Sequence, residues 1–299
     1  GPRRLQCVEV PRPEVEPGKV LVKMELTPIC GSDLRAVYGP RADDFPMPPG
    51  APGHEGVGIV VDPGDSGLEA GVPVLLMPRI ADAELYAEYQ TIESRQVIQL
   101  PETPPLSELV MAQQLGTVVF ACKTLPPLEG KDVVVIGQGT IGLFHDFVLR
   151  GRGAGRVIAI EPRPARLALS RSMGADETIG VIGQEATDAV LELTSGEGVD
   201  VIVDAVGSIE TLNQAMRIAK NDARIAAFGL LPTKEPARLD LDLFYTKSLS
   251  MNAVHGAQNQ PGLPDFREAL GFITRGEIDV SPLLSHRFPI TRVQEAFDL

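Results

Sequence analysis

Short apolar runs alternate with segments of helical spacing between about residue 119 and residue 253. These runs are rich in β-branched residues and cover 133–136, 157–160, 201–204, 225–229 and 248–253. An unbroken apolar run of this length indicates a strand that is buried on both faces, as in a parallel sheet. Because strands and helices alternate, we expect a doubly wound α/β domain over residues 119–253.

The chain before this region has a different pattern. Apolar and polar residues alternate along stretches such as 20–25, and Pro and Gly interrupt the sequence often, as at 46–52. This pattern is typical of a mostly antiparallel β domain, here over residues 1–118. An amphipathic helix is expected over 265–275, in a segment 254–299 that returns to this first domain. The first domain is therefore predicted to be discontinuous.

A glycine-rich turn follows the strand expected at 133–136 and leads into a helix. The turn consists of Gly137, Gln138, Gly139, Thr140, Ile141 and Gly142. In a strand–turn–helix unit with this spacing, the first glycine allows the tight turn and the second lets the backbone approach a pyrophosphate. The third lets the helix pack against the strand. The free N–H groups of the helix N-terminus would also favour phosphates. We expect Gly137, Gly139, Thr140, Ile141 and Gly142 to contact a dinucleotide in a Rossmann-type domain. The alternatives for such a turn alone are a plain glycine-rich turn or the cofactor loop of a methyltransferase.

Glu161 ends the next expected strand, nineteen residues after Gly142. A carboxylate at this place can bind both ribose hydroxyls of the adenosine half and would repel a 2′-phosphate, which favours NAD. Arg163 and Arg166 are cations that could pair with that phosphate, so NADP remains possible. Further along, the backbone at Gly229 is expected to hold the nicotinamide carboxamide, because residues 228–230 end a strand at that edge.

Cys30 and His54 lie in two glycine-bracketed segments, and Glu55 follows His54 directly. Thiolate, imidazole and carboxylate groups are all zinc ligands. Two ligands from separate segments are a weak signal, because a buried Cys or His is also common without a metal. The interpretation is strengthened by the motifs around them.

The order of these motifs resembles the zinc-containing medium-chain alcohol dehydrogenases, especially the polyol and threonine dehydrogenase branch. The resemblance runs along nearly the whole chain, through the segments 28–33, 53–58, 87–89, 204–207 and 278–283, and Phe297. It implies a GroES-like catalytic domain, a Rossmann domain with Val206 at the cofactor site, and hydride transfer between an alcohol and NAD. It also implies a catalytic zinc.

For the site residues, the resemblance implies that zinc is held by Cys30, His54 and Glu55. The metal would act as a Lewis acid on the alcohol. Ser32 would pass the proton from substrate to solvent, and Asp33 would fix the tautomer of His54. The alternative for Ser32 and Asp33 is a simple turn or helix cap, and for Cys30 a buried structural thiol.

The chain departs from the family pattern at several positions. Where the polyol branch usually has another ligand, a Glu before Pro-Leu, this chain has Gln113, and an amide oxygen is a poor zinc ligand. The four-cysteine structural zinc lobe is missing between Pro78 and Tyr89. Arg35 replaces a His that completes a proton relay in some members. A metal-free NAD(P)H-dependent reductase and a non-enzymatic dinucleotide-binding protein therefore remain as alternatives.

Composition limits the classes of binding partner that the protein can have. With 299 residues the chain is long enough for two cores, and its formal charge of −13 argues against nucleic acid or an anionic membrane as partner. Three cysteines cannot form a disulfide framework, which fits a reducing cytoplasm. No apolar run approaches the roughly 20 residues that span a bilayer. We expect a small alcohol or ketone as substrate and, from the resemblance, a homodimer or homotetramer. The family pattern also leads us to expect native residues beyond both ends.

Overall fold

The structure is a computed structural model that describes residues 4–39, 45–230, 236, 238–254 and 257–299. The chain divides into two compact units. The first comprises Gly1–Gly116 and Gly256–Leu299, and the second comprises Thr117–His255. The first unit contains an antiparallel sheet and the second a parallel sheet with helices, which confirms the predicted fold class.

The sheet of the first unit has five described strands in the order β4-β1-β2-β3-β5. Their bounds are β1 Lys19–Leu26, β2 Gly56–Asp62, β3 Pro73–Leu76, β4 Tyr89–Glu93 and β5 Val97–Gln99. All the neighbouring pairs are antiparallel. The apolar positions of the alternating pattern face one core, formed by Val20, Val22, Val60, Val74, Leu76, Leu85, Ile92 and Val97. The alternation in the sequence thus reflects burial of one face.

Helices complete the first unit. They are α1 Gly31–Tyr38, α2 Leu106–Leu109, α9 Pro264–Thr274 and α10 Val293–Asp298, while α3 Ala112–Lys123 runs from the first unit into the second. The helix predicted at 265–275 is α9. The C-terminal segment returns to this unit, where Phe297 packs edge-on against Tyr86 with ring centroids 5.6 Å apart. Tyr38 donates to Asp298 at 2.6 Å, so α10 is tied to α1.

The second unit contains six described strands, all parallel, in the order β11-β10-β9-β6-β7-β8. The strands are β6 Asp132–Ile136, β7 Arg156–Ile160, β8 Glu177–Ile179, β9 Val199–Asp204, β10 Ala219–Ala227 and β11 Ser250–Ala253. This is the doubly wound order, and the winding reverses between β6 and β9. The five expected strands are present, while the short β8 was not predicted. Its three residues are too few to show a pattern.

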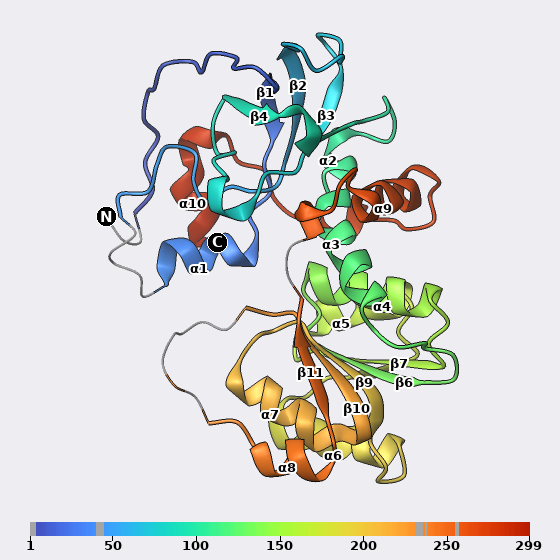
Figure 1. The fold of residues 1–299 in the computed structure, drawn as a ribbon. Coiled ribbons are helices and arrows are strands. Elements are labelled where there is room, and N and C mark those ends of the chain that lie inside the picture. The colour runs from blue at the N-terminus through green and yellow to red at the C-terminus, as the bar shows by residue number, and fades with distance from the viewer. Residues whose placement is uncertain (1–3, 40–44, 231–235, 237, 255–256) are drawn as a thin grey trace. The chain divides into compact units, whose positions relative to one another are not determined.

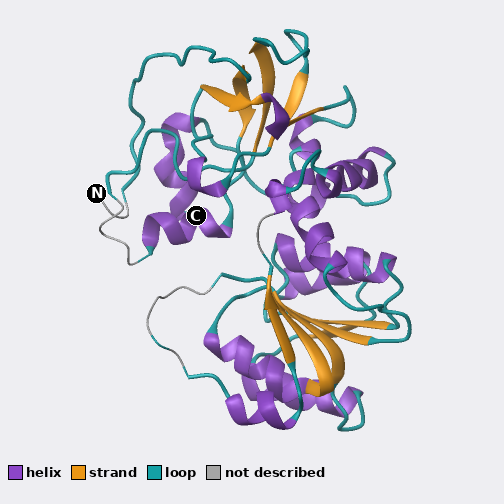
Figure 2. Cartoon of the chain, in the orientation of Figure 1, coloured by secondary structure: helices purple, strands orange, loops and turns teal. Residues whose placement is uncertain are grey.

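Helices cover both faces of this parallel sheet. They are α4 Thr140–Gly151, α5 Pro164–Ser172, α6 Gly183–Leu193, α7 Ile209–Ile218 and α8 Leu241–Thr246. In Figure 1, α4 and α5 lie on one face of the sheet, and α6 and α7 lie on the other. Figure 2 shows the strands of this sheet as a twisted fan between these helices. Because both faces are covered, the central strand β6 is apolar over Val133–Ile136, where no side chain is more than 3% exposed.

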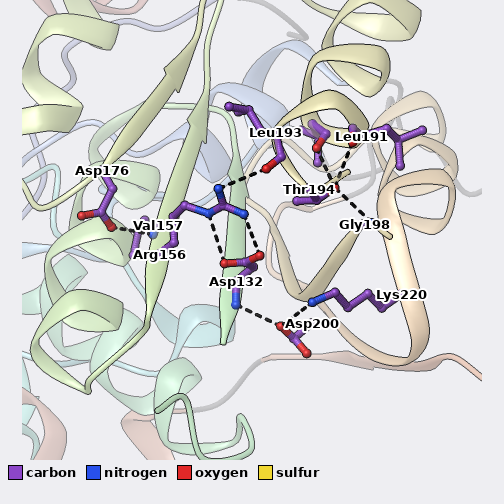
Figure 3. Close-up of polar contacts among 11 residues, drawn as sticks. Asp132, Arg156, Val157, Asp176, Leu191, Leu193, Thr194, Gly198, Asp200 and Lys220 are labelled. Carbon is purple, nitrogen blue, oxygen red and sulfur yellow. Dashed lines mark hydrogen bonds and ion pairs between the residues drawn. The ribbon is translucent and has the colours of Figure 1, made fainter. Parts of the chain in front are cut away.

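Ion pairs link the amino ends of the central strands (Figure 3). Arg156 of β7 holds Asp132 of β6 through two hydrogen bonds of 3.1 and 2.7 Å. Asp200 of β9 accepts from the backbone N–H of Asp132 at 3.0 Å and pairs with Lys220 of β10 at 3.4 Å. This charged network is formed by Asp132, Arg156, Asp200 and Lys220. It lies at the amino ends of the strands, opposite to the carboxyl ends where the glycine turn follows β6.

The three cysteines lie in different environments: Cys7 is exposed, Cys30 is partly buried and Cys122 is fully buried. Burial raises the pKa of the Cys122 thiol to about 12, consistent with a packing residue. No helix in the described part of the chain has the length and apolar character needed to cross a membrane.

Candidate functional site

Cys30 lies at the N-cap of α1, in an extended conformation that starts the helix at Gly31. Its backbone N–H donates to Oδ2 of Asp33 at 2.9 Å, as in a capping box. The cap therefore fixes the backbone of Cys30 and directs its side chain to one end of the helix. The local sequence CGSD thus brings a thiol and a carboxylate to the same end of α1.

His54 and Glu55 immediately precede β2 and are buried, with exposures of 6% and 2%. The preceding Gly53 packs against Tyr86, and a Cβ on Gly53 would lie only 2.9 Å from the tyrosine ring. A residue with a side chain would not fit beside this ring, so a glycine is needed in the backbone that leads to His54. The strand and the glycine together bring both side chains into the interior.

The ligand atoms of Cys30, His54 and Glu55 all lie within 4.8 Å of one another. Nε2 of His54 is 3.6 Å from Oε1 of Glu55. Across the described ranges, no other group of three Cys, His, Asp or Glu residues forms such a cluster. The separations match those between ligands that share one zinc ion, whose bonds are about 2.0–2.3 Å long. The structure thus brings together the three residues that the sequence analysis selected.

Asp33 connects the parts of this cluster. Its Oδ1 lies 2.9 Å from Nδ1 of His54, and its Oδ2 accepts from Tyr86 at 2.7 Å as well as from the backbone of Cys30. Asp33 is only 1% exposed. A carboxylate at Nδ1 fixes the tautomer with hydrogen on Nδ1 and leaves Nε2 free to bind a metal. The predicted partner of His54 is confirmed, and Tyr86 is a residue that the sequence gave no reason to select.

Ser32 lies at the same end of α1. Its Oγ is 3.4 Å from Nε2 of His54, the nitrogen that lies 3.6 Å from Oε1 of Glu55. The hydroxyl is therefore next to the cluster rather than turned toward solvent or used as a helix cap.

Gln114 holds the carboxylate of Glu55. Its Nε2 donates to Oε2 of Glu55 at 2.8 Å, and both side chains are buried. The sequence analysis pointed to Gln113 as the residue that replaces the usual anionic ligand and gave Gln114 no role. Gln113 is also buried. The signal that was available was the unusual pair of adjacent glutamines at the start of α3.

Burial and neighbouring charges shift the pKa values of the cluster. Burial raises the pKa of the Cys30 thiol, and the charge of Glu55 raises it further. For Glu55, burial raises the pKa to about 7. Burial opposes the charged form of His54, but hydrogen bonds to Asp33 and Cys30 outweigh it and raise its pKa to about 11. Without a metal the cluster therefore retains protons near neutral pH, and a divalent cation would compete with them. The donor set fits zinc.

The glycine turn lies where the sheet reverses its winding, after β6. Gly137 has a φ of +90°, which favours glycine. A Cβ on Gly142 would collide with the carbonyl oxygen of Gly137, so a glycine is needed for the helix to pack closely. Gly139 differs from both: its φ is −71°, and a Cβ there would have no atom within 4 Å. Thr140 and Ile141 begin α4, whose N-terminus follows the turn.

Glu161 lies at the end of β7, beside this turn, and is 5% exposed. Its Oε2 accepts from the backbone N–H of Gln138 at 2.9 Å, and its Oε1 accepts from the backbone N–H of Arg163 at 3.0 Å. Arg166 lies 3.9 Å from Oε2. The carboxylate is therefore fixed against the glycine turn, with a cation close by.

The ends of β9 and β10 meet through two glycines. A Cβ on Gly229 would collide with the backbone of Gly207, and the Gly229 N–H donates to the carbonyl oxygen of Asp204 at 2.8 Å. Oδ1 of Asp204 accepts from the N–H groups of Val206 and Gly207 at 3.0 and 3.1 Å. Asp204 therefore orders the backbone at Val206, a role that the sequence analysis missed.

Comparisons with known proteins agree with this arrangement. The alcohol dehydrogenase GroES-like domain matches residues 16–102, and the zinc-binding dehydrogenase domain matches residues 140–275. The L-threonine 3-dehydrogenase of Pyrococcus abyssi is 28% identical over 98% of this chain and 91% of its own length.

Two solved structures share the fold. Alcohol dehydrogenase TADH from Thermus sp. ATN1 superposes with a TM-score of 0.84 at 23% identity, covering 100% of this chain and 94% of that one. A zinc-binding dehydrogenase from Sinorhizobium meliloti, solved bound to NADP, superposes with a TM-score of 0.81 at 23% identity, covering 97% of this chain and 91% of that one.

The two units and their order along the chain define an oxidoreductase of the medium-chain class. The chain belongs to the zinc-containing medium-chain alcohol dehydrogenase family and is an alcohol dehydrogenase. The prediction of family and enzyme class from the sequence is confirmed.

Proposed function

We propose that this enzyme uses a zinc ion held by Cys30, His54 and Glu55 to transfer hydride between a small alcohol and NAD. The observation that carries the proposal is the convergence of the three ligand atoms within 4.8 Å inside one unit. The substrate that we favour is a secondary alcohol, a polyol or a hydroxy amino acid. The curated relatives at 26–28% identity are L-threonine 3-dehydrogenases, which supports this range.

The residues of the chain have distinct tasks in this scheme. Zinc, when bound, supplies a Lewis acid that lowers the pKa of the alcohol hydroxyl. Cys30 and His54 bind through Sγ and Nε2, and Asp33 keeps hydrogen on Nδ1 of His54 over their 2.9 Å contact. Ser32, whose Oγ is 3.4 Å from Nε2 of His54, accepts the alcohol proton and passes it toward solvent. Glu55 contributes a carboxylate whose orientation is set by Gln114.

Gly139 supports a bound dinucleotide. Its negative φ suits any residue and the space around its Cβ position is open, so the protein itself gives no reason for glycine there. A pyrophosphate against the turn would fill that space. Glu161 beside the turn favours NAD, although Arg166 is near and the related Sinorhizobium meliloti dehydrogenase was solved with NADP. We therefore propose NAD as the preferred cofactor and NADP as a weaker one.

Replacement of the thiol ligand tests the metal. Cys30→Ser should lose both bound zinc, measured by mass spectrometry of the native protein, and alcohol oxidation. Cys7→Ser, at an exposed cysteine, is the matched control and should retain both. Full oxidation by Cys30→Ser would overturn the zinc mechanism in favour of a metal-free reductase. A lack of turnover with every alcohol by zinc-loaded native protein would favour the non-enzymatic alternative.

A pair of glycine replacements tests the cofactor site. Gly139→Ala adds a methyl group in open space at the turn, and Gly151→Ala adds one in open space at the other end of α4. Both variants should fold with native stability. Only Gly139→Ala should weaken NADH binding, because its methyl group would meet the pyrophosphate. Equal NADH affinity of the two variants would contradict this placement of the cofactor.

The assembly that we propose is a homodimer or homotetramer. β11 is the edge strand of the parallel sheet, so its outer backbone groups can pair with the same strand of a second copy. Light scattering should therefore give a mass above that of the 32.0 kDa chain at micromolar concentration. A species of 32.0 kDa alone would rule out this assembly.

A further inference from the structure

Two polar side chains are completely buried beneath the glycine turn. Gln138 belongs to the turn, between Gly137 and Gly139, and Asp146 lies nearly two helical turns along α4; both are 0% exposed. Neither contributes an atom to the ligand cluster in the first unit. Buried polar groups cost free energy unless they are hydrogen-bonded, so the contacts of this pair need an explanation.

The two side chains contact each other, but only half of their polar atoms have partners. Nε2 of Gln138 donates to Oδ1 of Asp146 at 3.4 Å and to the carbonyl oxygen of Val135 at 3.5 Å. The other oxygens, Oε1 of Gln138 and Oδ2 of Asp146, are buried and have no partner among the described residues. Both oxygens are acceptors if Asp146 is ionised. A hydrogen on Oδ2 would turn one of them into a donor.

The described cations on and around α4 are engaged elsewhere and do not compensate a charge on Asp146. Within the described part of the chain, the charged groups on α4 and on the neighbouring β6, β7 and α5 have other partners. These contacts are Arg150 with Asp176, Arg156 with Asp132, Arg166 with Glu161, and Arg171 with Thr178. His145, which directly precedes Asp146 on α4, donates from Nδ1 to the carbonyl oxygen of Ile141. Burial lowers the pKa of His145 to about 4, so its side chain is neutral. Burial likewise raises the pKa of Asp146 well above its ordinary value.

We propose that Asp146 is protonated in the folded enzyme and forms a cyclic acid–amide pair with Gln138 that positions the glycine turn for the dinucleotide. In this pair Nε2 of Gln138 donates to Oδ1 of Asp146, and the Oδ2 hydroxyl donates to Oε1 of Gln138. All four polar atoms are then satisfied without any buried charge.

The pair acts on the turn through the backbone of Gln138. The N–H of Gln138 donates to Glu161, and its side chain is anchored to α4 by Asp146, so the residue between the two turn glycines is held from both sides. This part of the inference rests on the proposed cofactor site. Gln138 and Asp146 are positioning residues, because neither touches a reacting atom.

The protonation state is tested by the pH dependence of stability, without any cofactor. The pKa of Asp146 in the unfolded chain is the ordinary value of 3.8, while the folded value is raised. Above pH 3.8 the unfolded chain therefore loses a proton that the folded chain retains, and this group destabilises the fold increasingly as pH rises. Asp146→Asn provides the same donor and acceptor but cannot ionise.

Urea unfolding of both proteins between pH 6 and pH 8 gives the comparison. The folding equilibrium constant of Asp146→Asn relative to the native enzyme should increase about tenfold for each pH unit, up to the folded pKa. A ratio that does not change between pH 6 and pH 8 would show that Asp146 is already ionised in the fold and would overturn the proposal.

The pairing itself is tested with size-matched apolar variants. Gln138→Met and Asp146→Leu should each weaken folding, since each leaves a buried partner unsatisfied, and the double variant should be no weaker than either one. Additive losses would show that the two side chains do not form a pair.

Titration with NADH tests the positioning role. Asp146→Asn should bind NADH as the native enzyme does, whereas folded Asp146→Leu should bind at least fivefold more weakly. Unchanged binding by Asp146→Leu would remove that role. If the native enzyme itself does not bind NADH, the proposed cofactor site fails, and the stability measurements still decide the protonation of Asp146.

Discussion

The carboxamide of Gln114 donates to Oε2 of Glu55 over 2.8 Å and so leaves Oε1 of Glu55 facing Nε2 of His54 at 3.6 Å. A hydrogen bond of this kind fixes the orientation in which a buried carboxylate presents its oxygens to a metal. The geometry of the proposed zinc site therefore depends on a neutral side chain from α3 as well as on the three ligands.

Gln114→Leu should weaken zinc binding. The variant leaves Oε2 of Glu55 without its donor, so Glu55 loses its orientation and its pKa rises further above about 7. We expect zinc affinity to fall by roughly 10- to 100-fold, the usual effect of losing a residue that orients a metal ligand. Competition with a chromophoric chelator gives the affinity. Gln214→Leu, at a buried glutamine on α7 in the other unit, is the control and should leave it unchanged.

Asp33→Asn should weaken zinc binding more than Tyr86→Phe. The asparagine removes the negative charge beside Nδ1 of His54. It also replaces Oδ2, the oxygen that accepts from both the backbone of Cys30 and the hydroxyl of Tyr86, whereas the phenylalanine removes only that hydroxyl donor. We expect a loss of roughly 10- to 100-fold in zinc affinity for Asp33→Asn. The same competition assay compares the two variants, and equal affinities would argue against Asp33 as the residue that orients His54.

Zinc affinity should rise with pH between pH 6 and pH 9. In the metal-free enzyme His54 has a pKa of about 11 and the pKa of Cys30 is raised above 9.0, so both groups hold protons in this range and zinc must displace them. Each displaced proton should increase the apparent affinity by about tenfold per pH unit. Calorimetry in buffers of different ionisation enthalpy counts the released protons. Binding without proton release would contradict the protonated cluster.

Glu161→Gln should weaken NADH binding and reduce discrimination against NADPH. A hydrogen bond to a charged group contributes about 2 kcal/mol, so the neutral amide should lower NADH affinity by roughly 10- to 30-fold. Arg166, 3.9 Å from the carboxylate, would then be available to a 2′-phosphate. Fluorescence titration with both cofactors measures the effect. Glu177→Gln, at the amino end of β8, is the control and should change neither affinity.

Arg156→Leu should reduce stability without changing either site. Arg156 holds Asp132 through two hydrogen bonds at the amino ends of the strands, and both side chains are partly shielded from solvent. Loss of this two-point pair should cost about 1 kcal/mol in the free energy of unfolding. Urea denaturation measures the cost. A change in NADH affinity would show that the amino and carboxyl ends of the parallel strands are coupled.

Much of the fold could be predicted from the sequence, because strands buried on both faces have apolar runs that differ plainly from amphipathic helices. The runs at 133–136 and 157–160 became β6 and β7 almost residue for residue. β8 was missed because three residues, of which only Ile179 is buried, carry no periodicity. Residues 219–224 were not assigned to a strand because their polar side chains, such as Asp222, hide the long β10.

The residues of the candidate sites could be selected from motifs, but their partners could not. Cys30, His54 and Glu55 are recognisable by side-chain chemistry and by the glycines around them. Gln114 and Tyr86 contact the same cluster although they lie 59 and 53 residues along the chain from their partners, Glu55 and Asp33. This proximity depends on tertiary packing. The buried contact between Gln138 and Asp146 was hidden for a related reason, because a polar residue in a turn is ordinarily expected to face solvent.

Because the three cysteines differ in burial, their alkylation rates report on the state of the protein. A thiolate is the nucleophile that attacks an alkylating reagent, so the exposed Cys7 should be modified first and the fully buried Cys122, with its pKa of about 12, should not react while the fold is intact. Cys30 lies between these extremes, and its modification rate relative to Cys7 reports whether a metal protects it. Peptide mapping after a timed exposure would thus follow metal occupancy and unfolding in one sample of the protein, without any substitution.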